Sequence, residues 1–163
     1  MKKIFHLIIC MLLFCCTNES PQSLWDNAII MRDENRMKEC MINLESIIVK
    51  YPKHDLAAKA QFQKAEIYLN DIKDFDIAIE EFERVIDRFP NYDVAKNSLF
   101  MIAYIYYNYL SSYTDAIDKY KLFQHKYPDD ELIPSVEYEL EGLFNIEAII
   151  DSLNLIVSQK SNT

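Results

Sequence analysis

Side chains that could do covalent chemistry are few in this chain and lie far apart. Four cysteines, Cys10, Cys15, Cys16 and Cys40, could supply a nucleophile, a disulfide or a metal ligand. The first three fall within a predicted leader segment or at its end, which leaves Cys40 by itself. A single thiol without a neighbouring histidine does not predict a catalytic or metal site, so we expect Cys40 to be a small buried residue.

Histidine spacing predicts no metal centre. His6 lies in the leader segment, and His54 and His125 stand at unrelated positions without a neighbouring Cys or His. The only glycine, Gly142, excludes a glycine-rich phosphate-binding loop. We therefore expect no metal, no cofactor and no small-molecule substrate.

Acidic residues dominate the charge of the chain. Pairs such as Glu80-Glu81 and Asp129-Asp130 could act as a general acid and base, but a solvated helix face and a helix N-terminus explain them better. The net charge is −9, and it becomes −11 (−9 − 2) without Lys2 and Lys3. Such a surface repels phosphate groups, so nucleic acid is not an expected partner. These patterns favour a binding protein over an enzyme.

Three aromatic-proline pairs recur at a fixed interval and organise the whole chain. The pairs are Tyr51-Pro52, Phe89-Pro90 and Tyr127-Pro128, and their period is 38 (90 − 52 = 38 and 128 − 90 = 38). A constant period of about 40 residues is typical of a solenoid built from stacked copies of one unit. We therefore predict an all-α repeat fold.

Each predicted unit is a helical hairpin. Asp55 and Asp93, which follow a proline at the third position, are placed to cap the first helix, and Asp74 and Ser112 to cap the second. Proline then ends the unit because it cannot continue a helix. The second helices share a buried stripe at i, i+4, i+7, which consists of Ala78, Phe82 and Val85 in one unit and Ala116, Tyr120 and Phe123 in the next.

An incomplete copy precedes Pro52. Its first helix is predicted to bury Leu24, Ala28 and Met31, and its second Cys40, Leu44 and Ile47. Arg36 stands at the cap position of this second helix, and Asn35 is the alternative cap.

Beyond Pro128 the pattern loosens into a predicted helix pair. Pro134 suits a first helical turn, and Gly142 is expected to end that helix. A last amphipathic helix is predicted from Asn145 to about Ser158.

These residues resemble the tetratricopeptide repeat over about residues 22 to 128. That repeat has a small and an aromatic residue on its first helix, an alanine, an aromatic and a small or apolar residue on its second, and a final proline. The matching residues are Ala65, Tyr68, Ala78, Phe82, Val85 and Pro90, then Ala103, Tyr106, Ala116, Tyr120, Phe123 and Pro128.

The resemblance implies a right-handed solenoid of stacked antiparallel helical hairpins over residues 22–160, with about three clear repeats and a C-terminal helix pair. Gln61 and Lys64 depart from the pattern, which expects large apolar residues there. The long period and the aromatic-proline ending look like bacterial envelope versions of the repeat.

Residues 1–15 are predicted to be a signal peptide. Lys2 and Lys3 precede an apolar run from Ile4 to Phe14, well short of the roughly 20 residues that span a bilayer. The run ends in Leu13-Phe14-Cys15-Cys16, which resembles a bacterial lipobox and implies lipidation of Cys16, followed by a tether over residues 16–21. The alternative is an uncleaved hydrophobic helix, against which stands the polar segment that begins at Thr17.

The resemblance also implies a partner-binding groove lined by the first helices. It places Trp25, Phe62, Glu66, Leu69, Phe100, Tyr104 and Tyr107 there. Core packing is the alternative for the aromatic members, favoured for Phe62 and Phe100, whereas Tyr104 and Tyr107 are favoured as groove residues. Because the groove residues are aromatic and acidic, we expect it to bind apolar or basic segments.

A lipobox joined to such repeats resembles the family of bacterial envelope lipoproteins that includes the small lipoprotein of the outer-membrane β-barrel assembly machinery and its relatives. This implies a lipid-anchored periplasmic scaffold that binds envelope proteins, with Thr17 after the lipidated cysteine favouring the outer membrane. The alternative is a binding module that acts in envelope division, peptidoglycan-linked processes or secretion.

Overall fold

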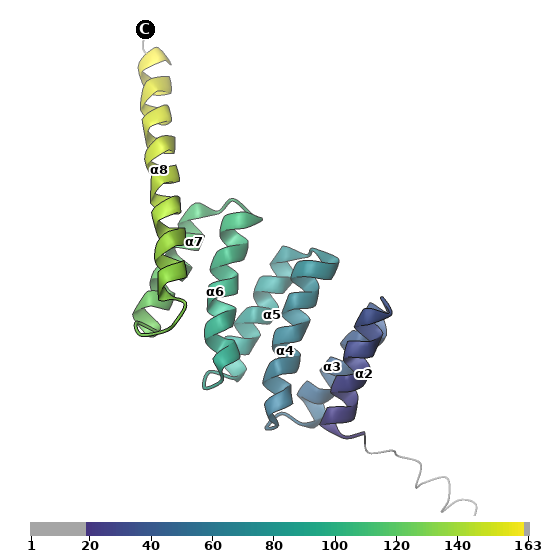
Figure 1. The fold of residues 1–163 in the computed structure, drawn as a ribbon. Coiled ribbons are helices and arrows are strands. Elements are labelled where there is room, and N and C mark those ends of the chain that lie inside the picture. The colour runs from purple at the N-terminus through teal and green to yellow at the C-terminus, as the bar shows by residue number, and fades with distance from the viewer. Residues whose placement is uncertain (1–18, 162–163) are drawn as a thin grey trace, which may run out of the picture.

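The computed structural model describes residues 19–161, and helices joined by short turns make up this part of the chain (Figure 1). The helices are α2 (Pro21–Asp33), α3 (Met37–Lys50), α4 (Asp55–Ile67) with its π-helical continuation η1 (Tyr68–Ile72), α5 (Phe75–Arg88), α6 (Asp93–Asn108), α7 (Tyr113–Lys126) and α8 (Ile133–Ser161). The predicted signal peptide, residues 1–15, and the predicted lipidation site Cys16 lie outside the described residues. Helix α2 begins at Pro21, just before the predicted start of the domain at position 22.

Three helical hairpins stack along the chain, as the run of colours from purple to yellow shows in Figure 1. Each second helix packs against its own first helix and against the first helix of the next unit. The core follows the stack as three clusters of buried side chains, between α2 and α4, between α4 and α6, and between α6 and α8. The prediction of an all-helical repeat solenoid is confirmed.

The aromatic-proline pairs form the turns between units. In each turn the carbonyl of the aromatic residue accepts a hydrogen bond from the N–H three residues later, with proline at the second position, where its fixed φ suits a type I turn. The three bonds join His54 N to Tyr51 O at 2.9 Å, Tyr92 N to Phe89 O at 3.1 Å, and Asp130 N to Tyr127 O at 3.2 Å.

Because of this turn, the observed N-caps of α4 and α6 lie one residue before the predicted ones. His54 is the N-cap of α4, and its Nδ1 accepts a hydrogen bond from Leu56 N at 3.1 Å. Tyr92 takes the same place before α6. The predicted caps Asp55 and Asp93 are therefore wrong, and both are instead the first residues of their helices, where a negative charge favours the helix dipole.

A second periodic turn joins the two helices within each unit. Asn35, Lys73 and Ser111 have left-handed φ values of 58°, 62° and 52°, and they recur with the same period (73 − 35 = 38 and 111 − 73 = 38). Helix ends of this kind usually use glycine. Asn35 is thus a turn residue and not the alternative cap, and Arg36 at the N-cap of α3 makes no capping bond.

The predicted caps of the other two second helices differ from each other. Asp74 caps α5 as predicted, since its Oδ1 accepts from Ile77 N at 3.2 Å. Ser112 occupies the N-cap of α7, but its hydroxyl donates to Asp115 and does not bond a backbone N–H.

Gln61 and Lys64, which depart from the repeat pattern, both contact a buried carboxylate on the next helix, α5. Glu81 of α5 is only 4% exposed, and its carboxylate accepts a hydrogen bond from Gln61 Nε2. Lys64 Nζ lies 3.6 Å from Glu81 Oε1, and Arg88 donates to Gln61 Oε1 at 3.2 Å. A buried polar network thus replaces apolar packing between α4 and α5.

The predicted C-terminal helix pair is wrong, because α8 runs unbroken from Ile133 to Ser161 through Gly142. A glycine inside a helix costs only about 1 kcal/mol relative to alanine, and long runs of helix-forming residues flank this one. Tyr107 Oη lies 3.6 Å from the place where a Cβ on Gly142 would sit, so α8 passes close to α6 at this point.

Candidate partner-binding surface

The first helices of the units face the viewer in Figure 1, and the second helices lie behind them. Two aromatic residues of the predicted groove are largely core residues. Phe62 is half-buried and meets the ring of Phe82 edge-on, and Phe100 is half-buried against Tyr120 and Phe123. These contacts favour the core interpretation of Phe62 and Phe100.

Leu69 does not belong to the surface. It is 3% exposed and packs in the cluster between α4 and α6, so the groove assignment of Leu69 is wrong. The physical reason is that Leu69 follows the fully buried Ala65 by four residues, about one helical turn, so it lies on the same buried face. Trp25 is half-buried against the first core cluster and keeps part of its ring accessible.

Glu66 lies beside an ion pair that joins the first two units. Arg32 Nη2 of α2 is 2.8 Å from Asp71 Oδ2 of η1. Burial raises the pKa of the half-buried Glu66 carboxyl, the Arg32 guanidinium opposes that rise, and the Asp71 charge adds to it. Burial likewise raises the pKa of the Cys40 thiol, which is 1% exposed, so Cys40 is the small buried residue that the sequence predicts.

Tyr104 and Tyr107 belong to a group of tyrosines at the C-terminal end of α6. Tyr104 meets Tyr109 with ring centroids 6.0 Å apart, and Tyr107 meets Tyr113 at 6.2 Å, both edge-on. All of these rings are half-buried or exposed, so each keeps accessible surface. We call Tyr104, Tyr107, Tyr109 and Tyr113 the tyrosine surface.

Acidic and hydroxyl groups surround the tyrosine surface. Burial raises the pKa of the Glu139 carboxyl on α8. Burial also raises the pKa of Tyr104, with smaller contributions from Tyr109 and Glu139. Tyr120 is fully buried behind this surface, and its pKa is raised far above the usual range by burial and then by the Glu139 charge.

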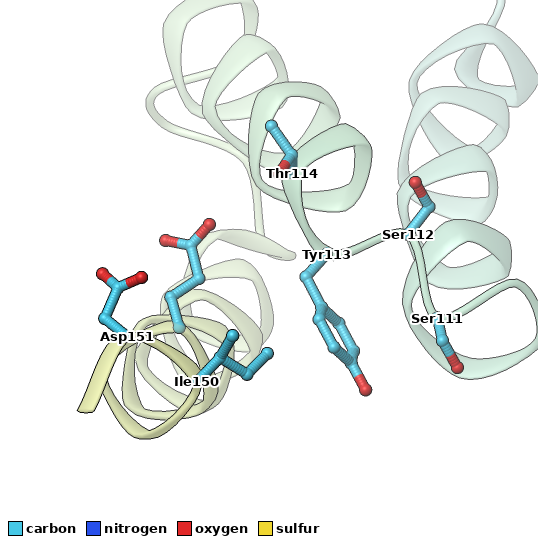
Figure 2. A pocket seen from close by; sticks show the side chains of 7 residues that line it. Ser111, Ser112, Tyr113, Thr114, Ile150 and Asp151 are labelled. Atoms are coloured by element: carbon cyan, nitrogen blue, oxygen red, sulfur yellow. The ribbon is translucent and has the colours of Figure 1, made fainter. Parts of the chain in front are cut away.

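A cleft of about 450 Å³ opens next to Tyr113. One wall is the turn from α6 to α7, with Ser111, Ser112, Tyr113 and Thr114, and the other is α8, with Glu147, Ile150 and Asp151. Figure 2 shows Ile150 and Asp151 on α8 across the cleft from Tyr113. Two carboxylates and no cationic side chain line this cleft.

The sequence pattern does not predict this cleft. Tyr113 and Glu147 are far apart in the sequence, and only the length and path of α8 bring them together (Figure 2). A predicted helix break at Gly142 would have directed residues 147–151 elsewhere. The unbroken helix is therefore what creates the cleft.

No group of three or more His, Cys, Asp or Glu side chains within residues 19–161 could hold a metal ion. None of the helices in that range is long and apolar enough to cross a membrane.

Comparison with known proteins agrees with the geometry. Residues 59–92 and 97–130 each match the tetratricopeptide repeat family model. The starts of the two matches differ by 38 (97 − 59 = 38), which is the period of the prolines and of the left-handed turns. A search of curated proteins found no match to the chain. The two matched segments support a helical repeat of the tetratricopeptide type, which suggests a protein–protein interaction module.

Proposed function

We propose that this protein is a lipid-anchored scaffold that binds proteins of a bacterial cell envelope on the periplasmic side of the outer membrane. The observation that carries the partner-binding part of the proposal is the tyrosine surface together with the adjoining acidic cleft, whereas the anchor and the location rest on the sequence that precedes Thr17. Tetratricopeptide repeats act in protein–protein interaction, and here accessible aromatic rings lie next to carboxylates at one end of a repeat.

The surface suits a segment that is apolar or basic. Tyrosine rings offer a large contact area for few frozen torsions, which makes them frequent anchors in protein interfaces. Glu147 and Asp151 give the cleft negative charge, and the chain as a whole carries −9. A basic partner segment would relieve the repulsion among these carboxylates, and an acidic one would increase it.

The anchor in this proposal is a lipid on Cys16. Helix α2 begins at Pro21, so only a few residues separate Cys16 from the repeat domain (21 − 16 = 5). At about 3.4 Å each they reach roughly 17 Å. Such a short tether would hold the repeats next to the membrane, where proteins of outer-membrane assembly are found, and we propose that process as the setting.

The lipid anchor and the partner-binding surface are tested by two separate measurements. Mass spectrometry of the mature N-terminus should find an acylated Cys16, and an unprocessed Met1 or an unmodified Cys16 would refute the anchor. The binding half is tested by affinity capture from envelope extract with a Tyr104→Ala, Tyr107→Ala double variant. We expect capture of envelope partners to fall at least about tenfold, the loss of about 1.4 kcal/mol of binding free energy.

A matched control lies on a second helix, away from the tyrosine surface. Ile42 and Val49 of α3 are exposed apolar residues, and the Ile42→Ala, Val49→Ala variant should capture the same partners as wild type. Both double variants should keep near wild-type helicity and melting. If the tyrosine variant captures the same proteins in the same amounts, the binding surface lies elsewhere.

A further inference from the structure

Glu139 of α8 holds a half-buried carboxylate without a cationic partner. Burial raises the pKa of this carboxyl, and no cationic side chain within residues 19–161 offsets that rise. An unpaired charge that is partly removed from water costs free energy, so Glu139 does not help the helices to pack. Groups that are retained at such a cost are frequent at functional sites.

Glu139 lies on the side of α8 that faces α6. Gly142 follows it by three residues, which places the two about 60° apart around the helix. A Cβ on Gly142 would lie 3.6 Å from Tyr107 Oη and would meet no other atom of a neighbouring helix within 4 Å. The side of α8 that Glu139 and Gly142 share is therefore next to the tyrosine surface, and it is not tightly packed there.

Tyrosine hydroxyls surround this carboxylate. Burial is the main cause of the raised pKa of Tyr104 and of Tyr120, and the Glu139 charge contributes to both. An electrostatic effect of this kind requires proximity, so the carboxylate and the two hydroxyls belong to one site. Tyr104 and Tyr107 are half-buried, which leaves part of each ring accessible beside Glu139.

Tyr120 gives the site a second polar group that lacks a partner. Its side chain is fully buried, and its Oη has no hydrogen-bond partner within the described part of the chain. After burial and Glu139, Tyr104 and Tyr107 also contribute to its raised pKa, so this hydroxyl is directed toward the same site. A buried hydroxyl without a partner is costly. Rotation of a half-buried tyrosine ring would open it to a hydrogen-bond donor.

These groups suit a cationic side chain. The site offers one negative charge, hydroxyl oxygens that accept hydrogen bonds, and accessible aromatic rings that attract cations. An acidic ligand would be repelled, and an apolar ligand would bury the carboxylate further without pairing it. Arginine fits these groups well, because its planar guanidinium can bond a carboxylate and stack on a tyrosine ring together.

We propose that Glu139 determines the specificity of the partner-binding surface by binding an arginine or lysine side chain of the partner beside Tyr104 and Tyr107. This rests on the proposed function, since the tyrosine surface must hold the partner segment. It narrows the chemistry of that segment to a basic residue at this position. Glu139 lies beyond residues 97–130, the second segment that matches the repeat family, so the repeat pattern does not mark it.

Binding of defined peptides to the full chain tests the proposal. The probes are short amidated peptides in which leucine alternates with arginine, and matched peptides with glutamine or glutamate in place of arginine. Fluorescence anisotropy gives each Kd. Wild type should bind the arginine peptide at least about tenfold more tightly than the glutamine peptide, because a hydrogen bond to a charged group has this strength. Glu139→Gln should remove that preference.

Glu137 provides a control with the same change in net charge. It is exposed, is turned about 200° from Glu139, and lines a shallow pocket with Gln124 of α7. Glu137→Gln should therefore bind the arginine peptide as wild type does. Glu139→Gln should melt at or above the wild-type temperature, because its carboxylate has no cationic partner to lose. Weaker binding by that variant is then not a result of unfolding.

Charge reversal tests the same residue in the opposite direction. Glu139→Lys should bind the glutamate peptide more tightly than the arginine peptide. Glu137→Lys changes the net charge equally and should keep the wild-type preference for arginine. Reversal by both lysine variants would show an effect of net charge only and would overturn the proposal.

Three further outcomes would refute the role of Glu139. They are equal affinity of wild type for the arginine and glutamine peptides, no binding of the arginine peptide, and wild-type affinity in Glu139→Gln. The Tyr104→Ala, Tyr107→Ala variant should weaken binding of both the arginine and the glutamine peptide. Loss in this variant but not in Glu139→Gln would keep the tyrosine surface and reject Glu139. Loss in Glu139→Gln alone would keep the Glu139 site and reject the tyrosine surface.

Discussion

The ring of Phe62 meets the ring of Phe82 edge-on, with centroids 5.3 Å apart and an angle of 64° between the planes. One period later, Phe100 and Tyr120 repeat the contact at 5.5 Å and 67°. Phe82 and Tyr120 are fully buried, and their partners are half-buried. Each of these two units thus holds its second helix on its first through the same aromatic pair, in the geometry that aromatic quadrupoles prefer.

Truncation of the fully buried ring of either pair, Phe82 or Tyr120, should destabilise the protein strongly. We expect Phe82→Ala or Tyr120→Ala to lower the free energy of unfolding by about 3 to 5 kcal/mol, because each leaves a cavity next to a small alanine. Urea denaturation of the purified variants, followed by circular dichroism, measures this. An unchanged unfolding curve would contradict the packing.

The Tyr120 hydroxyl provides a control for that experiment. Within the described residues its buried Oη has no hydrogen-bond partner. Tyr120→Phe should therefore leave stability unchanged or raise it by up to about 1 kcal/mol. Tyr51→Phe should have the opposite effect, a loss of about 0.5 to 1 kcal/mol, since Tyr51 Oη donates to Glu19 O at 2.6 Å.

Glycine at the left-handed turn should stabilise the repeat. Lys73 has a φ of 62°, which strains an L side chain, so Lys73→Gly should raise the free energy of unfolding by about 0.5 to 1 kcal/mol. Asn35→Gly should gain less, because asparagine tolerates this conformation. Lys59→Gly, on the exposed side of α4, should instead lose about 1 kcal/mol. Equal effects of the three changes on the melting temperature would contradict the assignment.

Removal of the buried carboxylate between α4 and α5 should be more costly than removal of the whole polar contact. Glu81→Ala leaves the buried Gln61 Nε2 donor without its acceptor, whereas Lys64 keeps its ion pair with Glu45 at 2.6 Å, and we expect a loss of about 1 to 3 kcal/mol. The double variant Gln61→Leu, Glu81→Leu restores apolar packing and should lose less. Denaturant unfolding of both variants measures the difference, and a double variant less stable than the single would refute this account.

The charge on Glu66 should lower stability at neutral pH. Burial raises the pKa of its carboxyl in the folded protein above the unfolded value, so the folded state holds this proton more tightly. The stability linked to Glu66 is therefore full below the unfolded pKa of about 4.3 and is lost as pH rises through the folded pKa. Glu66→Gln should melt above wild type at pH 7, and this difference should disappear below about pH 4. A difference that is the same at both pH values would contradict the raised pKa.

The repeat and its local geometry could be predicted from the order of residues along the chain. The period of 38, the turns at Tyr51, Phe89 and Tyr127, the Asp74 cap and the buried stripe of α5 and α7 were all predictable. Helices, caps and proline turns depend on residues within about one turn of each other, so the order of residues along the chain is enough to specify them.

Tertiary structure decided how these elements meet. It buried Leu69 in the core between α4 and α6, paired Gln61 with Glu81 across two helices, and carried α8 through Gly142 so that Asp151 faces Tyr113 across a cleft. These outcomes depend on how far each helix rotates and extends against its neighbour. Since a change of one residue in a helix turns every later side chain by about 100°, periodicity alone cannot say which surface residues come together.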